Sequence, residues 1–312
     1  MQNPTVSAII PTMDRPRELL RAVESVRDQT YEPIELVVIE EGVTEPQVPA
    51  LLADAGFDST EFRHVFNEEP TGVEVARNQA VAHSSGEYLA FLDDDDEWYP
   101  TKIEKQLSRI RETGCDVCYT GAERRGPDGD LRATAIPDVE GDARSRTLAG
   151  AIIGPSVFVV SRDGFETVGG FDEEIPFWED WDFLYRLSER YRFTGVHEPL
   201  AKIHTDADVR RSDAPDLAER GGRYLIDKHC PIDHERQRFA TRRFKSRVWN
   251  GVGRSALMNG RYSDARAFFA RAVLEWPFDR SLLLYGALSY GGDPVLQTAQ
   301  TVKRGVVGMV HD

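Results

Sequence analysis

The chain has 312 residues, of which 53 are acidic and 38 basic, giving a formal net charge of −15 with 40 % hydrophobic residues. This length and hydrophobic content suit one large folded domain or two unequal ones, and they exclude disorder of the whole chain. No apolar run approaches the roughly 18 residues of a membrane-spanning helix, and residues 1–5 do not begin a secretory signal, so we expect a cytoplasmic protein.

The first 120 residues alternate short β-type runs with helix-type periodicity. This alternation predicts βαβ units and a mainly parallel central sheet flanked by helices. The expected strands are residues 6–10, 34–39, 62–66, 88–92 and 116–120. One helix is expected from about Arg15, a second over residues 73–83 and a third over residues 100–113. Helical or turn structure is expected over residues 46–56.

The rest of the chain changes character twice. Residues 123–147 are polar and typical of a loop or an edge hairpin. Residues 154–204 are expected to complete the first domain, and the elements predicted there are a strand at 156–160, a turn at Gly169-Gly170, a helix at 179–190 and strands near Phe193 and Ile203. From about Ala214 the pattern is helical, and helices at 263–276 and 281–290 resemble one tetratricopeptide-like hairpin. We therefore predict an α/β domain over residues 1–210 and a helical C-terminal extension over residues 211–312.

An acidic tetrad, Asp93-Asp94-Asp95-Asp96, directly follows the buried run at 88–92. It therefore lies at the carboxyl edge of the predicted sheet, where open α/β folds bind ligands. Alternation along an extended chain lets Asp93 and Asp95 face together. Four adjacent carboxylates repel one another, and a hard cation such as Mg²⁺ or Mn²⁺ relieves this repulsion. A solvated acidic turn is the alternative.

Three further segments carry groups suited to binding or catalysis. Glu40 and Glu41 end the second predicted strand. Gly72 precedes a helix whose Arg77 can pair with phosphate oxygens. Asp180 lies in the first turn of the helix at 179–190, where the helix dipole offers a purely structural explanation for an acid.

Six segments in this order resemble the inverting family 2 glycosyltransferases of the GT-A fold, over about residues 4–205. They are residues 6–12, 29–31, 72–78, 91–98, 169–172 and 179–182. The resemblance implies a nucleotide-diphospho-sugar transferase fold and a nucleotide-sugar donor. The donor-binding residues that it implies by position are Pro11, Thr12, Asp14, Glu40, Glu41, Arg77, Asp93 and Asp94. The family usually has Asp-Asp-Gly-Ser where this chain has Glu40-Glu41-Gly42-Val43, which leaves the donor base open.

The resemblance also implies the chemistry. Asp95, with His204, would hold Mg²⁺ or Mn²⁺, which neutralises the diphosphate leaving group. Asp180 would take the proton from an acceptor hydroxyl during a single inverting displacement. Glu179 is expected on the acceptor side, where Trp178 and Trp181 are candidates for an apolar sugar platform, although we expect core packing to take at least one of these rings.

Two other functions remain open at this point. A nucleotidyltransferase shares the nucleotide-binding half but does not need Asp180. A catalytically silent scaffold, binding partners through its helical tail, is the alternative from a different class. Among acceptors, a lipid-phosphate-linked glycan used for protein glycosylation or cell-surface polysaccharide is the expected candidate.

Charge type and distribution support two further hypotheses. The basic residues comprise six lysines and 32 arginines beside the excess of carboxylates, which suits a chain that must stay soluble in high salt. A GC-rich genome that favours arginine codons is the alternative. Residues 236–312 hold 13 basic and 5 acidic residues, so this tail is expected to meet the acidic body of the chain or an anionic membrane at the inner face. Aromatic residues do not alternate with the basic residues of this tail in the manner of a nucleic-acid-binding segment, so we expect no nucleic-acid partner.

Overall fold

The computed structural model describes residues 3–147, 154–204, 214–230, 238–279 and 281–291. By its internal contacts the chain divides into two compact units. The first unit comprises residues 1–144, 152–173 and 183–206, and the second comprises residues 145–151, 174–182 and 207–312. The predicted boundary between residues 210 and 211 lies outside the described residues.

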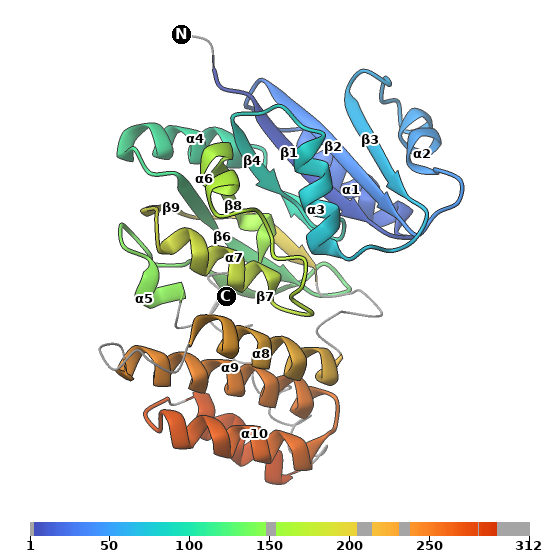
Figure 1. Cartoon of the computed structure of the whole chain (residues 1–312). Coiled ribbons are helices and arrows are strands. Elements are labelled where there is room, and N and C mark those ends of the chain that lie inside the picture. Colours follow the sequence, from blue (N-terminus) through green and yellow to red (C-terminus); the bar gives the residue numbers. More distant parts are fainter. Residues whose placement is uncertain (1–2, 148–153, 205–213, 231–237, 280, 292–312) are drawn as a thin grey trace. The chain divides into compact units, whose positions relative to one another are not determined.

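The first unit is built on a nine-stranded sheet within the part of the chain that the structure describes (Figure 1). Its strands are β1 (Val6–Thr12), β2 (Ile34–Glu41), β3 (Phe62–Asn67), β4 (Tyr88–Phe91), β5 (Glu97–Trp98), β6 (Val117–Arg125), β7 (Leu131–Ala135), β8 (Phe158–Ser161) and β9 (Phe193–His204). The order is β3-β2-β1-β4-β8-β6-β9-β5, with β7 paired to β6. Strands β3, β2, β1 and β4 are parallel, as are β6 and β9, whereas β8, β7 and β5 run antiparallel to their neighbours.

Two helical layers cover this sheet, each burying one apolar face (Figure 1). Helices α1 (Pro16–Arg27), α2 (Val48–Asp54) and α4 (Lys102–Thr113) pack on one face. Helices α3 (Val73–Ala82), α6 (Arg162–Thr167) and the latter part of α7 (Glu179–Ser188) pack on the other. The alternating and helical apolar patterns of the sequence therefore produce the expected α/β layers.

The strand register determines where the polar residues gather. Thr12 of β1 pairs with Glu40 of β2, and Ile9 of β1 pairs with Phe91 of β4. The carboxyl ends of β1, β2 and β4 consequently lie at one edge of the sheet, and the acidic tetrad follows there.

The structure corrects several predicted elements. The strand expected at 156–160 begins only at Phe158, because Pro155–Val157 forms a 3₁₀ turn. The two strands expected near Phe193 and Ile203 are one continuous strand, β9. The two-residue strand β5 was not predicted. The polar segment 123–147 contains the edge hairpin of β6 and β7, which confirms that prediction.

The second unit is helical. Its helices are α8 (Pro215–His229), α9 (Arg238–Met258) and α10 (Tyr262–Glu275), and residues 281–291 are also helical. Leu282 packs in one apolar cluster with Phe269 of α10, and Arg266 donates to the carbonyl of Ser289 at 2.9 Å, so these two helices form the predicted antiparallel pair. No helix within the described ranges is long and apolar enough to cross a bilayer.

Candidate functional site

The acidic tetrad forms a turn after β4 in which exposure alternates. Asp94 and Asp96 are buried at 6 % and 4 % exposure, whereas the side chains of Asp93 and Asp95 are 34 % and 19 % exposed. Although the backbone is a turn and not a strand, Asp93 and Asp95 are the two acids most open to solvent. These two therefore present their carboxylate oxygens most openly, while Asp94 has a side chain that is 8 % exposed.

The two buried acids hold the turn in place. Asp94 accepts hydrogen bonds from Thr12 Oγ1 at 2.8 Å and from Arg15 Nη1 at 3.0 Å, and burial raises its pKa to about 6. Asp96 accepts from Ser156 Oγ at 2.6 Å and from the backbone N–H of His204 at 3.2 Å. Burial and the neighbouring carboxylates raise the pKa of Asp96. These contacts tie the tetrad to β1, to β9 and to the 3₁₀ turn before β8.

Each accessible acid is paired with an arginine from a different element. Arg77 Nη2 of α3 lies 2.6 Å from Asp93 Oδ1, and its side chain is 3 % exposed. The Arg77 guanidinium also lies over the ring of Phe171, 5.2 Å from its centroid. Arg15, which precedes α1, reaches Asp95 Oδ2 at 3.3 Å. The two guanidiniums thus neutralise part of the charge of the tetrad, since Arg15 also contacts Asp94.

The predicted nucleoside contacts on β1 and β2 have specific protein partners. Glu40 accepts from the backbone N–H groups of Gln47 and Val48, at 3.1–3.2 Å, and lies 3.0 Å from His64 Nε2. Its carboxylate thus caps the start of α2. Pro11 lies within β1 and is buried, and Asp14 is exposed with φ of 52°.

Glu41, the next residue of β2, binds the loop before α3 as Glu40 binds the start of α2. It accepts from Thr71 Oγ1 at 2.6 Å, from Asn67 Nδ2 at 3.1 Å and from Gly72 N–H at 3.2 Å. The loop that precedes α3, and therefore the position of Arg77, depends on this carboxylate. The roles of Glu40 and Glu41 toward a nucleoside stay predictions, because the structure shows both of them binding their own chain.

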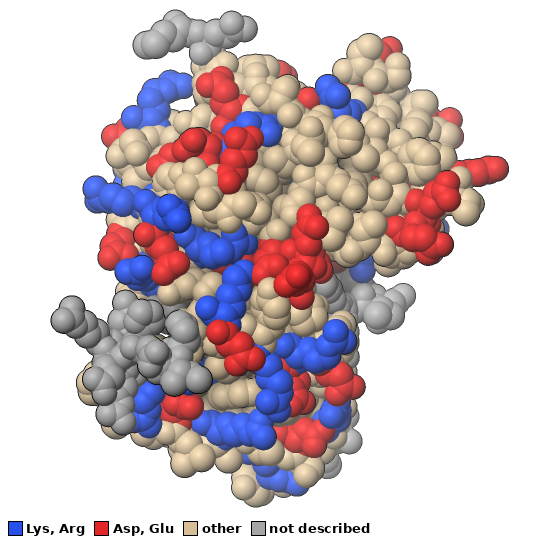
Figure 2. Space-filling model, viewed as in Figure 1, with Lys and Arg blue, Asp and Glu red and all other residues tan. Residues whose placement is uncertain are grey.

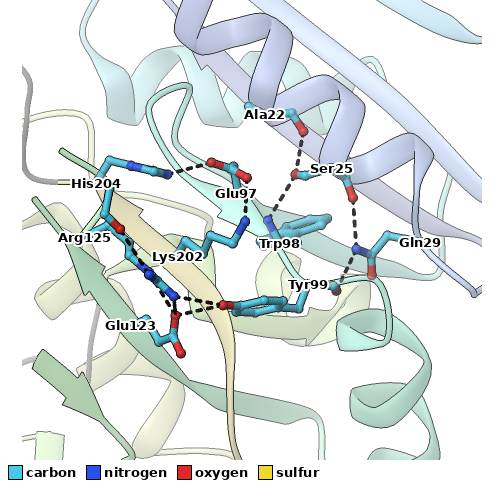
Figure 3. A network of polar contacts seen from close by, with 11 residues as sticks. Ala22, Ser25, Gln29, Glu97, Trp98, Tyr99, Glu123, Arg125, Lys202 and His204 are labelled. Carbon is cyan, nitrogen blue, oxygen red and sulfur yellow. Dashed lines mark hydrogen bonds and ion pairs between the residues drawn. The ribbon is translucent and has the colours of Figure 1, made fainter. Parts of the chain in front are cut away.

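His204 belongs to a polar network at the end of the sheet (Figure 3). Its Nε2 lies 2.7 Å from Glu97 Oε1, and Lys202 Nζ lies 2.9 Å from Glu97 Oε2. These two hydrogen bonds lower the pKa of Glu97 to about 2. Figure 3 shows Tyr99, Glu123 and Arg125 beside them, and the Tyr99 hydroxyl donates to Glu123 Oε2 at 2.8 Å. A metal bound through Nε2 would have to displace this contact with Glu97, whereas a metal bound through Nδ1 would leave it in place.

The oxygen-only chemistry of Asp93 and Asp95 fits Mg²⁺ or Mn²⁺. Within the described ranges, however, no three His, Cys, Asp or Glu side chains are grouped so as to hold a metal ion by themselves. An ion at Asp95 would therefore take its remaining ligands from water in the ligand-free protein and from oxygens of the donor once the donor is bound. Such a ligand set is usual for Mg²⁺, which commonly binds one or two carboxylates together with substrate phosphates.

The second unit contains the start of α7. Asp180 Oδ1 accepts from the backbone N–H of Trp181 at 2.7 Å, and Glu179 precedes it in the first turn. Asp182 is buried and lies 2.8 Å from both Lys228 Nζ and His229 Nε2 at the end of α8. This buried ion-pair cluster fixes the first turn of α7 within the second unit.

The two tryptophans flanking the acids have packing roles. Trp181 is 5 % exposed and donates its Nε1–H to the carbonyl of Thr147 at 2.6 Å. Trp178 has φ of 66°, and its ring lies where a Cβ at Gly222 or Gly251 would approach to 3.3 or 2.9 Å. The sequence therefore places glycines where α8 and α9 meet this ring, and the expectation that packing takes at least one tryptophan is confirmed for Trp181.

Sequence reasoning missed three residues that organise the first unit's polar surface: Arg15, Glu97 and Lys202. Arg15 was detectable in principle, because it is a cation placed three residues after the carboxyl end of β1. Glu97 and Lys202 meet across 105 residues through the pairing of β5 with β9, for which the sequence offers no local signal.

Comparison with known proteins places the chain among relatives of known name and fold. The family described as "Glycosyl transferase family 2" matches residues 7–169. TuaG of Bacillus subtilis, a glycosyltransferase named for teichuronic acid biosynthesis, is 31 % identical over 160 residues, covering 51 % of this chain and 63 % of TuaG. The chain spans between 30 % and 63 % of the length of three curated relatives.

Two solved structures share the fold. S. aureus TarS 1–349 in complex with UDP-GlcNAc matches with a TM-score of 0.64 and 17 % identity, over 86 % of this chain and 81 % of that one. The mannosyltransferase PcManGT from Pyrobaculum calidifontis, in complex with GDP-Man and Mn²⁺, matches with a TM-score of 0.59 and 15 % identity, over 98 % and 87 % of the two chains. The predicted GT-A architecture is thereby confirmed.

Proposed function

Because the chain belongs to glycosyl transferase family 2, we propose that it is an inverting glycosyltransferase that moves a sugar from a nucleoside diphosphate donor to a hydroxyl acceptor. The observation that carries the proposal is the pairing of the accessible Asp93 and Asp95 with Arg77 and Arg15 at the carboxyl edge of the sheet. A nucleoside diphosphate-sugar offers groups suited to this edge, since ribose hydroxyls suit the accessible carboxylates and phosphates suit the partly exposed guanidinium of Arg15, while the buried Arg77 holds Asp93 in position.

In the proposed reaction Asp180 accepts the proton of the acceptor hydroxyl. The acceptor oxygen forms a bond to the anomeric carbon while the bond from that carbon to the phosphate oxygen breaks, and the nucleoside diphosphate leaves with the bonding pair. A divalent cation bound at Asp95 would stabilise the charge on the leaving group. Glu179 is proposed to orient the acceptor, and His204 to support the cation.

The likeness to TuaG supports a role in cell-surface glycan assembly, and the fold shared with TarS bound to UDP-GlcNAc and PcManGT bound to GDP-Man supports a nucleotide-sugar donor. We extend the proposal to a lipid-phosphate-linked acceptor at an anionic membrane face. Part of the basic tail, residues 236–312, is paired within the tail itself, since Arg242 and Arg247 of α9 contact Glu275 and Asp279 at 3.7 and 2.9 Å. Arg243 is exposed on the same helix and remains available to lipid phosphates. Sedimentation with anionic vesicles, compared with neutral ones, tests this extension.

Nucleotide binding tests the donor site first. We expect one of UDP, GDP and dTDP to raise the thermal unfolding midpoint when Mn²⁺ or Mg²⁺ is present, because ligands that bind only the folded state stabilise it. A folded sample that responds to none of these nucleotides contradicts the proposal and favours the silent scaffold.

The Asp180→Asn variant then tests the chemistry with the donor so identified. Loss of a general base is expected to lower the transfer rate by about 10²- to 10⁴-fold without weakening nucleotide binding. Asp128→Asn, in the exposed turn of the β6–β7 hairpin, is the matched control and should retain full activity. Transfer that is unaffected by Asp180→Asn rules out the assignment of the base, and nucleotidyl transfer that persists in this variant supports the nucleotidyltransferase.

A further inference from the structure

Arg15 contacts two members of the acidic tetrad at once. It is the residue before α1, and Asp14, which precedes it, adopts the left-handed region with φ of 52°, a conformation that aspartate tolerates better than most residues. This turn directs Arg15 back toward the tetrad. Its Nη1 lies 3.0 Å from Asp94 Oδ1 and 3.3 Å from Asp95 Oδ2.

The two contacts of Arg15 differ in their surroundings. Asp94 is buried, also accepts from Thr12 and has the shorter contact with the guanidinium. Asp95 is 19 % exposed, and its contact is longer. Because solvent-accessible ion pairs contribute little stability, the Asp94 contact serves as the anchor, whereas the Asp95 contact can be exchanged at small cost.

Arg77 offers a contrast on the other side of the tetrad. Its side chain is 3 % exposed and packs over Phe171, whereas that of Arg15 is 34 % exposed. Arg77 is therefore held in position. Arg15 retains a solvent-facing guanidinium that can turn from one anion to another.

Ligand binding would change the electrostatics around Arg15 in a defined way. A divalent cation at Asp95 repels the guanidinium, since like charges a few ångströms apart disfavour each other. The diphosphate that arrives with the donor supplies anionic oxygens, which guanidinium binds in a planar, two-pronged geometry. Building on the proposed donor site, we propose that Arg15 is a counter-ion of Asp95 in the ligand-free protein and moves to the donor diphosphate when a divalent cation binds at Asp95.

The first half of this proposal is tested by titrating the protein with Mn²⁺ in the absence of nucleotide. Electron paramagnetic resonance measures the Mn²⁺ that stays free. Arg15→Gln is expected to bind Mn²⁺ about two- to fivefold more tightly than the wild type, because the competing cation is removed. Asp95→Asn defines which uptake belongs to this site. The proposal is overturned if Asp95→Asn and the wild type take up Mn²⁺ equally, or if Arg15→Gln does not bind it more tightly.

The second half is tested by calorimetric titration of UDP or GDP at saturating Mn²⁺. Arg15→Gln is expected to weaken nucleoside diphosphate binding about tenfold or more, the loss of a charge-assisted hydrogen bond. The same nucleoside without phosphate should bind both proteins equally. An undiminished diphosphate affinity in Arg15→Gln refutes the transfer.

Two further variants make the result specific. Arg17→Gln removes an exposed arginine from the first turn of α1 and should change neither affinity by more than about twofold, since screened surface charges have small effects. Arg15→Lys keeps the charge and the tie to Asp94 if Arg15→Gln fails to fold, and it should show wild-type Mn²⁺ affinity with weakened diphosphate binding. If the wild type binds Mn²⁺ at Asp95 but no nucleoside diphosphate, the proposed function fails, whereas the Mn²⁺ comparison still decides the counter-ion role.

Discussion

Among individual residues, Lys102 in α4 combines full burial with a charge. It is 0 % exposed, its Nζ donates to Gln106 Oε1 at 2.8 Å, and the same atom lies 4.3 Å from the centroid of the Trp98 ring. No carboxylate is among these contacts. Burial therefore lowers the pKa of Lys102 to about 7, because desolvation disfavours the charged amine.

This lowered pKa makes stability depend on pH in a definite direction. Between about pH 7 and the ordinary lysine value of 10.5, the unfolded chain binds a proton at this residue that the folded chain does not. Stability therefore rises with pH across this window, and the full cost of burying the charge is present below it. Lys102→Met is expected to stabilise the protein by about 1–3 kcal/mol at pH 6 and by much less at pH 10. Urea unfolding at both pH values measures the difference.

Lys105 on the same helix is the matched control for Lys102. Its side chain is 38 % exposed and pairs with Glu198 at the surface. Lys105→Met should change stability by less than about 1 kcal/mol, as is typical of surface pairs, and equally at both pH values. A gain for Lys102→Met that does not shrink toward pH 10 would show that the buried amine is not the titrating group.

At the level of elements, α8 and the segment 174–182 of the second unit approach each other closely through their backbones. A Cβ at Gly221 would lie 2.6 Å from the carbonyl oxygen of Phe177 and 2.7 Å from its Cβ. Neither atom is the end of a flexible side chain, so the approach cannot be relieved by a rotamer change. Only glycine fits at this position of α8.

We therefore expect Gly221→Ala to destabilise the second unit by about 1–3 kcal/mol, the usual cost of overpacking. Gly286→Ala is the matched control, because among the described residues its Cβ would meet only Phe269 Cβ at 4.0 Å and residue 286 is helical. That substitution should stabilise by about 0.5–1 kcal/mol through helix propensity. Tryptophan fluorescence during urea unfolding reports on this unit, since four of the five tryptophans lie in it. A Gly221→Ala variant as stable as the wild type would refute the packing argument.

The elements also show how far the sequence could be interpreted. Strands with several consecutive buried residues, such as β1 and β2, were predicted because their apolar runs are bounded by Pro11 and by charged residues. Strand β5 has only Glu97 and Trp98, too few residues to show any period. The two strands expected near Phe193 and Ile203 are one, because β9 continues through Pro199 with only an irregular register toward β6.

On the scale of the whole molecule, the sequence likewise predicted only those parts of the candidate site whose residues lie close together along the chain. The motifs located Asp93, Asp95 and Arg77 because their types and order are local in sequence. The pairing of Arg15 with Asp94, 79 residues away, and of Lys202 with Glu97 arises only when the strands align. Residue types at strand ends therefore identify the edge where a site forms, whereas the partners that orient them come from tertiary register.

Net charge is the other property of the whole chain that has a testable consequence. Figure 2 shows acidic side chains gathered over the loops that follow β2 and β3 and interleaved charges of both signs over the helices of the second unit. The loops contain Glu45, Glu68 and Glu69, all exposed. With a net charge of −15, mutual repulsion of such groups opposes the compact state.

Salt should relieve this repulsion. The Debye length falls from about 10 Å at 0.1 M to about 3 Å at 1 M, so we expect the thermal unfolding midpoint to rise steadily with KCl over this range. A variant combining Glu45→Gln, Glu68→Gln and Glu69→Gln should start from a higher midpoint at low salt and rise less steeply, because it carries less charge to screen. If stability is instead greatest at low KCl, attractive arginine–carboxylate pairs outweigh the repulsion between carboxylates. The hypothesis of adaptation to high salt would then be wrong, and the arginine bias would reflect codon usage.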